Sequence, residues 1–76
     1  MNAEYLDLRL QRCPMALLLA KRAAMQLAID QSLTILSHDL VSIRDMAGFF
    51  SQPPFTVKLN TDANVTTLYV TKRNTL

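Results

Sequence analysis

The run from Pro14 to about Ile29 constrains the fold most, because its composition predicts a long helix near the N-terminus. The run is rich in alanine, leucine and methionine, which are strong helix formers. A proline suits the first helical position because its missing N–H would be unpaired there in any case. One side of the helix is mostly alanine, which lets it lie close against a sheet. The residues on that side are Ala16, Leu19, Ala20, Ala23, Ala24 and Leu27.

The opposite side of this helix mixes polar and apolar residues. Lys21, Arg22 and Gln26 mark it as facing solvent. We expect the second helix or the C-terminal segment to cover the apolar residues on this side. The alternative is that they form a surface that binds a partner. These apolar residues are Met15, Leu18, Met25 and Ile29.

Four strands and a second helix are predicted in the rest of the chain. Each strand is marked by alternation of apolar and polar residues, or by a short run rich in β-branched residues. Ser42 or Asp39 can cap the second helix, and the prolines after Gln52 end it. The predicted strands are Tyr5–Arg9, Leu33–Leu36, Phe55–Leu59 and Val65–Lys72, and the second helix runs from Ile43 to about Ser51.

The order βαβαββ predicts an α/β (α+β) two-layer sandwich, in which two helices cover one face of a four-stranded mixed sheet. A turn cluster at 60–64 separates the last two strands, so they should form a hairpin. A chain of 76 residues is expected to be a single domain, 1–76. Polar residues suit the sheet face that the helices leave open, namely Asp7, Arg9, Lys58, Thr66 or Thr67, and Lys72.

The composition limits the cellular compartment and the classes of partner that we expect for this chain. One cysteine excludes an internal disulfide, so a reducing compartment, the cytoplasm, is expected. The first residues lack the basic and then apolar pattern of a signal peptide, and polar residues interrupt the longest apolar stretch. We therefore expect no membrane association. The net charge of +2 is spread along the chain, so direct nucleic-acid binding is not expected.

Cys13 is the candidate reactive residue because it stands just before Pro14, at a strand-to-helix junction. The first turn of a helix has unpaired N–H groups and a partial positive charge, which lower the pKa of a thiol. Arg9 and Arg12 are close in sequence and act in the same direction. An exposed thiolate of low pKa can attack a persulfide and pass the terminal sulfur on. Position alone leaves open the alternative of a buried, unreactive cysteine.

No cofactor is expected. One cysteine and one histidine cannot build a closed zinc site, and Gly48, the only glycine, excludes a glycine-rich phosphate loop. His38 follows the second predicted strand, and neighbouring parallel strands end at one side of a sheet, so a Cys–His pair is conceivable. Only its neighbour Asp39 is available in the sequence to orient it. We therefore interpret His38 as a loop residue rather than a catalytic base.

Two segments resemble the signatures of the TusA/SirA family (UPF0033-type). Leu6 to Leu17 reads LDLRLQRCPMAL, which is similar to Leu-Asp-x-Arg-Gly-x-x-Cys-Pro-x-Pro. Asp39 to Phe49 reads DLVSIRDMAGF, which is similar to Asp-Pro-x-Ser-x-x-Asp-Ile-Pro. The resemblance covers essentially the whole chain, and the two signatures stand at matching separation.

The resemblance implies a βαβαββ sandwich and a sulfur relay. In such a relay Cys13 accepts persulfide sulfur from a cysteine desulfurase and passes it to a downstream acceptor protein. Family destinations include tRNA thiolation, molybdenum-cofactor synthesis and sulfur oxidation, with related domains in selenium metabolism. The protein would then be a sulfurtransferase-like co-substrate rather than a self-contained enzyme. The residues expected to shape the site are Pro14, Asp7, Arg9, Arg12, Asp39, Ser42, Arg44 and Asp45.

Four positions depart from the family signatures. Ala16 replaces the second proline, which restores an N–H that is able to donate toward Cys13. Leu10 replaces a glycine and therefore requires a negative φ. Leu40 and Ala47 replace two further prolines. These changes indicate a divergent paralogue. The alternatives to a sulfur carrier are a regulatory or partner-binding module that transfers no sulfur, and an RNA-binding module.

Overall fold

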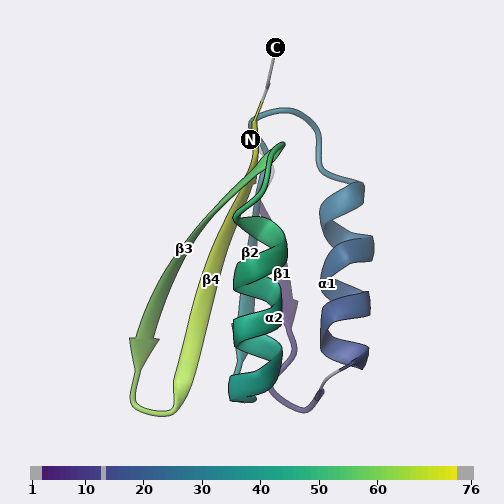
Figure 1. The fold of residues 1–76 in the computed structure, drawn as a ribbon. Coiled ribbons are helices and arrows are strands. Elements are labelled where there is room, and N and C mark those ends of the chain that lie inside the picture. The colour runs from purple at the N-terminus through teal and green to yellow at the C-terminus, as the bar shows by residue number, and fades with distance from the viewer. Residues whose placement is uncertain (1–2, 13, 74–76) are drawn as a thin grey trace.

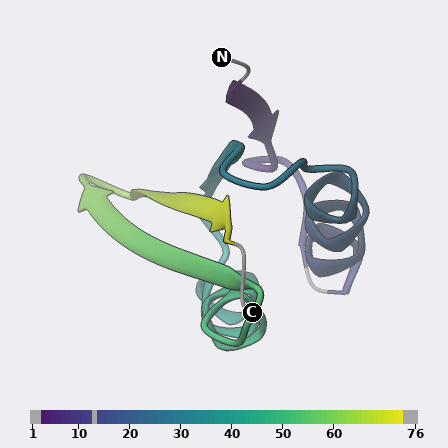
Figure 2. The same cartoon turned by 90° about the horizontal axis from the view of Figure 1, so that it is seen from above.

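The structure is a computed structural model that describes residues 3–12 and 14–73. Its order βαβαββ confirms the predicted fold class. The sheet order is β1-β2-β4-β3, with β1 parallel to β2 and β4 antiparallel to both of its neighbours. Both helices lie on one face of this mixed sheet (Figures 1 and 2). The elements are β1 (Ala3–Asp7), α1 (Met15–Met25), β2 (Ser32–Ser37), α2 (Leu40–Phe50), β3 (Phe55–Asp62) and β4 (Val65–Lys72).

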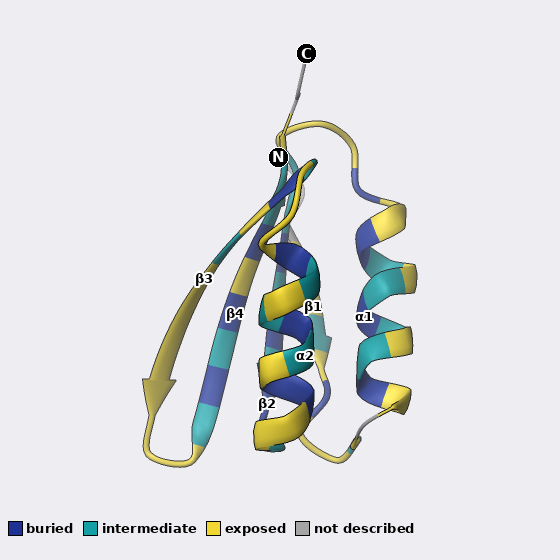
Figure 3. Ribbon diagram, in the orientation of Figure 1, coloured by how far each residue is buried: buried dark blue, intermediate teal, exposed yellow. Residues whose placement is uncertain are grey.

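The core lies between the two central strands and the helices. Leu33 and Ile35 of β2 stand opposite Val70 and Leu68 of β4, and all four side chains are buried. The helices cover them through the predicted alanine face of α1 and through large apolar residues of α2, so one side of each helix is buried (Figure 3). The buried helix residues include Ala16, Ala20, Ala24, Met46 and Phe50.

Helix α1 ends at Met25, earlier than the predicted end at Ile29. Gln26 and Leu27 donate their N–H groups to carbonyls three residues back, which closes the last turn. Leu27 then points into the core, and Asp30 adopts a φ of 69°. Aspartate tolerates this left-handed conformation better than most residues. Leu27 continues the apolar spacing of the helix, which is why the sequence predicted a longer one.

Helix α2 begins at Leu40, three positions before the predicted start at Ile43, because Asp39 is its N-cap. The Asp39 carboxylate accepts hydrogen bonds from the Ser42 backbone N–H at 3.2 Å and from the Ser42 hydroxyl at 2.6 Å. The side chain of Ser42 is fully buried. Of the two caps considered, Asp39 is therefore the cap and Ser42 is the residue that it binds.

The hairpin is longer than predicted, because β3 continues to Asp62 and only Ala63 and Asn64 form the turn. Of the two threonines considered for the open face, Thr67 is the one that lies there, because Thr66 is buried on the helix side of β4. Lys72 differs from the prediction, since it lies on the helix side, where its ammonium donates to the Leu27 carbonyl at 3.3 Å. Both placements follow from the alternation that places Leu68 and Val70 in the core.

The apolar residues on the outer side of α1 are not covered by any described residue, so the expectation that they are buried is wrong. Their exposed fractions lie between 49% and 67%. Helix α2 instead contacts the flank of α1, where the Lys21 ammonium lies 4.7 Å from the centre of the Phe49 ring. We call the exposed set the α1 outer stripe; it consists of Met15, Leu18 and Met25 of α1 and of Ile29 in the segment that follows the helix.

No helix among the described residues is both long enough and apolar enough to span a membrane.

Candidate functional site

The candidate site lies where β1 and β2 end. These strands are parallel, so the segments that follow their carboxyl ends leave the sheet on the same side. Leu8 is buried, and its N–H donates to the Leu36 carbonyl at 2.8 Å, which extends the pairing beyond β1. The Gln11 N–H then donates to the Leu8 carbonyl at 3.0 Å. These two hydrogen bonds hold the chain in a tight turn next to the buried Leu8, and the chain then continues toward α1.

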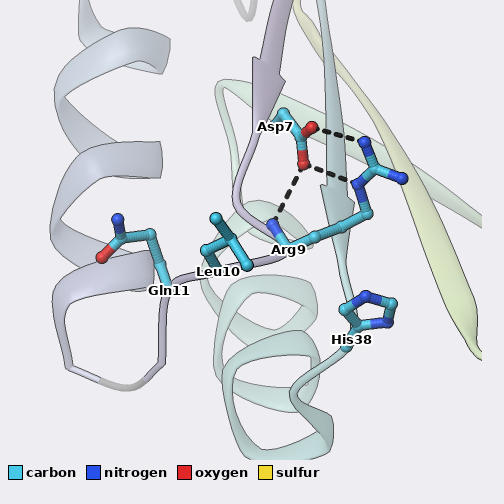
Figure 4. Close-up of a pocket in the computed structure, with 5 residues that line it drawn as sticks. All are labelled: Asp7, Arg9, Leu10, Gln11 and His38. Atoms are coloured by element: carbon cyan, nitrogen blue, oxygen red, sulfur yellow. Dashed lines mark hydrogen bonds and ion pairs between the residues drawn. The ribbon is translucent and has the colours of Figure 1, made fainter.

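Asp7 and Arg9 form a tight pair at the start of this turn (Figure 4). The Arg9 guanidinium donates through Nε at 2.9 Å and Nη2 at 2.7 Å to the two carboxylate oxygens of Asp7. The backbone N–H of Arg9 also donates to that carboxylate at 3.1 Å. These hydrogen bonds lower the pKa of Asp7 from 3.8 to about 2, and the same pairing raises the pKa of Arg9. Both residues stay charged and hold one geometry.

Two adjoining hollows lie beside this pair. The larger, of about 410 Å³, is shown in Figure 4, and the other has a volume of about 370 Å³. Cys13 lies outside the described residues, but its sequence neighbour Arg12 lines the second hollow. The larger hollow is lined by Asp7, Arg9, Leu10, Gln11 and His38, and the second by Arg9, Leu10, Gln11, Arg12, His38 and Asp39.

His38 lines both hollows, although Asp39 was the only residue available in the sequence to orient it. In the structure its Nδ1 lies 3.1 Å from the Asn64 carbonyl oxygen in the β3–β4 turn. Because a carbonyl only accepts, Nδ1 is the protonated nitrogen in this contact, and in the neutral ring Nε2 is an acceptor. In the sequence, the end of the predicted second strand indicated where His38 lies. No sequence feature indicated its contact with the distant β3–β4 turn.

The structure brings together only part of the predicted site. Asp7, Arg9, Arg12 and Asp39 all line the hollows. Pro14 directly precedes α1 as its N-cap residue but makes no side-chain cap. The sequence had not selected Leu10 and Gln11, which lie inside the first signature. The predicted residues in the described part of the chain that do not line these two hollows are Pro14, Ser42, which is buried beneath Asp39, and Arg44 and Asp45, further along α2.

Two predictions about the departures from the signatures concern the backbone. The Ala16 N–H donates to the Arg12 carbonyl at 2.9 Å, and its position relative to Cys13 lies outside the described residues. Through this hydrogen bond the first turn of α1 fixes Arg12. Leu10 is not among the described residues with positive φ, which are Asp30 and Ala63, as its side chain requires.

The chemistry available around the hollows is that of charged and polar side chains. Within residues 3–12 and 14–73, no three histidine, aspartate or glutamate side chains gather as metal ligands would. Arg9 and Arg12 supply positive charge, while the carboxylates of Asp7 and Asp39 are each engaged in hydrogen bonds. A group held here meets donors from the two arginines and, in the neutral His38 ring, an acceptor at Nε2.

Comparison with known proteins gives one result. A model of the family described as sulfurtransferase TusA matches residues 4–72. No curated protein and no solved structure matches the chain significantly.

Proposed function

The chain belongs to the TusA sulfurtransferase family, and from this premise we propose that it relays sulfur on Cys13. The observation that carries the proposal is the family match itself, which spans both signatures and includes Cys13, the only cysteine. Family membership implies a sulfur-carrier role. The relay, its donor and its acceptor are our proposal.

The proposed chemistry is a pair of thiol–persulfide exchanges. The Cys13 thiolate attacks the outer sulfur of a persulfide on the donor, so that a new S–S bond forms and the donor's own S–S bond breaks. The donor leaves as a thiolate, and Cys13 holds the transferred sulfur as a persulfide. A thiolate on the acceptor then attacks the outer sulfur of that persulfide, which returns Cys13 to the thiolate. No external oxidant or reductant is consumed.

The charged residues around the hollows support this chemistry. Arg12 adjoins Cys13 in sequence, and its positive charge favours a thiolate over a thiol. The Asp7–Arg9 pair fixes the turn that precedes Cys13, so we assign Asp7 a positioning role. Asp39 and Ser42 fix the start of α2, and with it the segment that holds His38.

We assign the donor to a cysteine desulfurase and the acceptor to a second thiol protein, both in the cytoplasm. The α1 outer stripe provides a surface on which such a protein can dock, because it exposes four apolar side chains and its first member, Met15, stands two residues after Cys13 in sequence. The same stripe favours a second candidate function, a partner-binding module in which Cys13 transfers no sulfur. An experiment on the thiol separates the two functions.

The test is an intact-mass measurement after incubation with a cysteine desulfurase, cysteine and pyridoxal phosphate under non-reducing conditions. A carrier gains one sulfur atom, about 32 Da, which a reductant removes. Cys13→Ser should abolish the gain. If several desulfurases add no sulfur to the wild-type protein, the sulfur-carrier proposal is wrong and the partner-binding module stands.

The pH dependence of Cys13 alkylation tests the role of Arg12 separately. Arg12→Gln should raise the thiol pKa, because it removes the positive charge next to Cys13 in sequence. Arg22→Gln is the matched control, since it removes an arginine from the outer side of α1 instead. Equal alkylation profiles for wild type and Arg12→Gln would contradict this role without touching the relay.

A further inference from the structure

Strand β3 forms an edge of the sheet with one side available for pairing. Among the described residues it pairs only with β4, and β1 forms the opposite edge. Its residues from Lys58 to Asp62 are all exposed, including Leu59, whose exposed fraction is 47%. Pro53 and Pro54 have no backbone N–H, and the Phe55 N–H donates to the Gln52 carbonyl at 3.0 Å, so the N–H groups open to pairing begin after Phe55.

The hairpin determines which backbone groups of β3 face this open edge. A two-residue turn is closed by a hydrogen-bonded pair, here Asp62 and Val65, and hydrogen-bonded and non-hydrogen-bonded pairs alternate along an antiparallel ladder. At the other end of the ladder, the Arg73 N–H donates to the Pro54 carbonyl at 2.6 Å, which fits the same alternation. The N–H and C=O groups of Leu59 and Thr61 therefore face outward.

The charges on β3 are self-complementary. Lys58 and Asp62 lie four residues apart, so both side chains stand on the same sheet face, with Asn60 midway between them. An antiparallel copy of the strand that is centred on Asn60 reverses this order. Each lysine then stands directly opposite an aspartate, and the pairing contains two such ion pairs related by a two-fold axis.

We infer that β3 is the docking edge for a second copy of this chain, joined by antiparallel β3–β3 pairing centred on Asn60. Leu59 exchanges backbone hydrogen bonds with Thr61 of the partner subunit, and Lys58 faces Asp62 of the partner subunit. The charged pair falls at a non-hydrogen-bonded position, where side chains of facing strands lie closest. The two subunits form one continuous eight-stranded sheet, and the two-fold axis closes the assembly as a dimer.

Charge selects this register over its neighbours. A shift of two residues in either direction places Lys58 or Asp62 opposite Asn60, and a shift of four residues places like charges opposite one another. A lysine on an edge strand commonly prevents pairing between sheets. Here Lys58 is neutralised in the centred register only, where Asp62 of the partner subunit stands opposite it. A single strand edge is a small interface, so the dimer is weak and depends on concentration.

The test is sedimentation equilibrium of the full chain from low micromolar to about 1 mM, at low salt and with a reductant so that Cys13 cannot form a disulfide dimer. Lys58→Asp and Asp62→Lys each place like charges opposite one another in the homodimer, so each alone should raise the dimer Kd at least about tenfold. An equimolar mixture of the two variants restores both ion pairs and should form a heterodimer close to wild type in affinity. The double variant should dimerise like the wild type.

The control is Arg22→Asp, which makes the same change of net charge on α1 as Lys58→Asp makes on β3 and should leave the Kd unchanged. Circular dichroism confirms that each variant is folded. A wild type that stays monomeric at the highest concentration overturns the proposal. So do single variants that dimerise normally, a mixture no tighter than either variant, or an equal loss in Arg22→Asp. None of these outcomes bears on sulfur transfer, which is measured separately on Cys13.

Discussion

Removal of the Asp39 side chain should destabilise the protein more than the loss of an ordinary helix cap. Asp39→Ala removes the acceptor for both the backbone N–H and the hydroxyl of Ser42. Loss of the cap costs about 1 kcal/mol. The Ser42 side chain is fully buried, so its hydroxyl loses its acceptor away from water, which costs a further 1–3 kcal/mol or so. We expect a total loss of about 2–4 kcal/mol from the free energy of unfolding.

A double-mutant cycle tests the reasoning behind this magnitude. Ser42→Ala alone should cost about 1 kcal/mol, the net value of one hydrogen bond, because it leaves no buried hydroxyl behind. The combined variant of Asp39 and Ser42 should therefore be more stable than the sum of the single losses predicts, by about 1 kcal/mol or more. Urea denaturation followed by circular dichroism gives all four free energies, with equal m-values as the check on two-state unfolding. Strict additivity, or a loss below about 0.5 kcal/mol for Asp39→Ala, would refute the argument from the buried hydroxyl.

Three further predictions concern the turn before Cys13, the hairpin and α1. The Asp7 carboxylate should titrate by NMR near its pKa of about 2, and Arg9→Ala should return this pKa toward 3.8. Because folding lowers the pKa of Asp7, its contribution to stability is complete above the pKa of the unfolded chain and disappears as the pH falls through the pKa of the folded protein. Ala63→Gly should stabilise the protein by about 1 kcal/mol in urea denaturation, because Ala63 has a φ of 57°, and unchanged or lower stability would contradict this. Ala20→Leu should lower the free energy of unfolding by about 1–3 kcal/mol, because it overpacks the fully buried face of α1. Leu18→Ala on the α1 outer stripe should change this free energy by less than about 0.5 kcal/mol. Similar losses in both variants would show that the two faces are assigned wrongly.

The elements that the sequence predicted best are those whose pattern reports directly on burial. Strand β4 runs from Val65 to Lys72 as predicted, since its alternation places Leu68 and Val70 in the core. The alanine face of α1 was also recognisable, because only small side chains allow a helix to lie so close to a sheet. The end of α1 was missed because Leu27 continues the apolar spacing into the following turn.

The features that the sequence could not supply depend on distant segments. Exposure of Leu18 and Met25 is decided by where α2 lies relative to α1, and no local pattern carries that information. Part of the candidate site was predictable, since Asp7 and Arg9 lie in one signature and Asp39 in the other. The sequence allowed Asp39 to be a helix cap. The observed start of α2 at Leu40 shows that it is one.

The hydrogen bond from His38 to the Asn64 carbonyl connects the candidate site to the hairpin. Asn64 belongs to a two-residue turn, so the position of its carbonyl depends on how β3 and β4 twist together. Asp62, which carries one half of the proposed ion pair, directly precedes this turn. Pairing with a second copy along β3 would restrain the hairpin toward its free end, where Leu59 is exposed. A dimer joined at this edge would therefore also hold the His38 ring against the hollows, although β3 and β1 lie at opposite edges of the sheet.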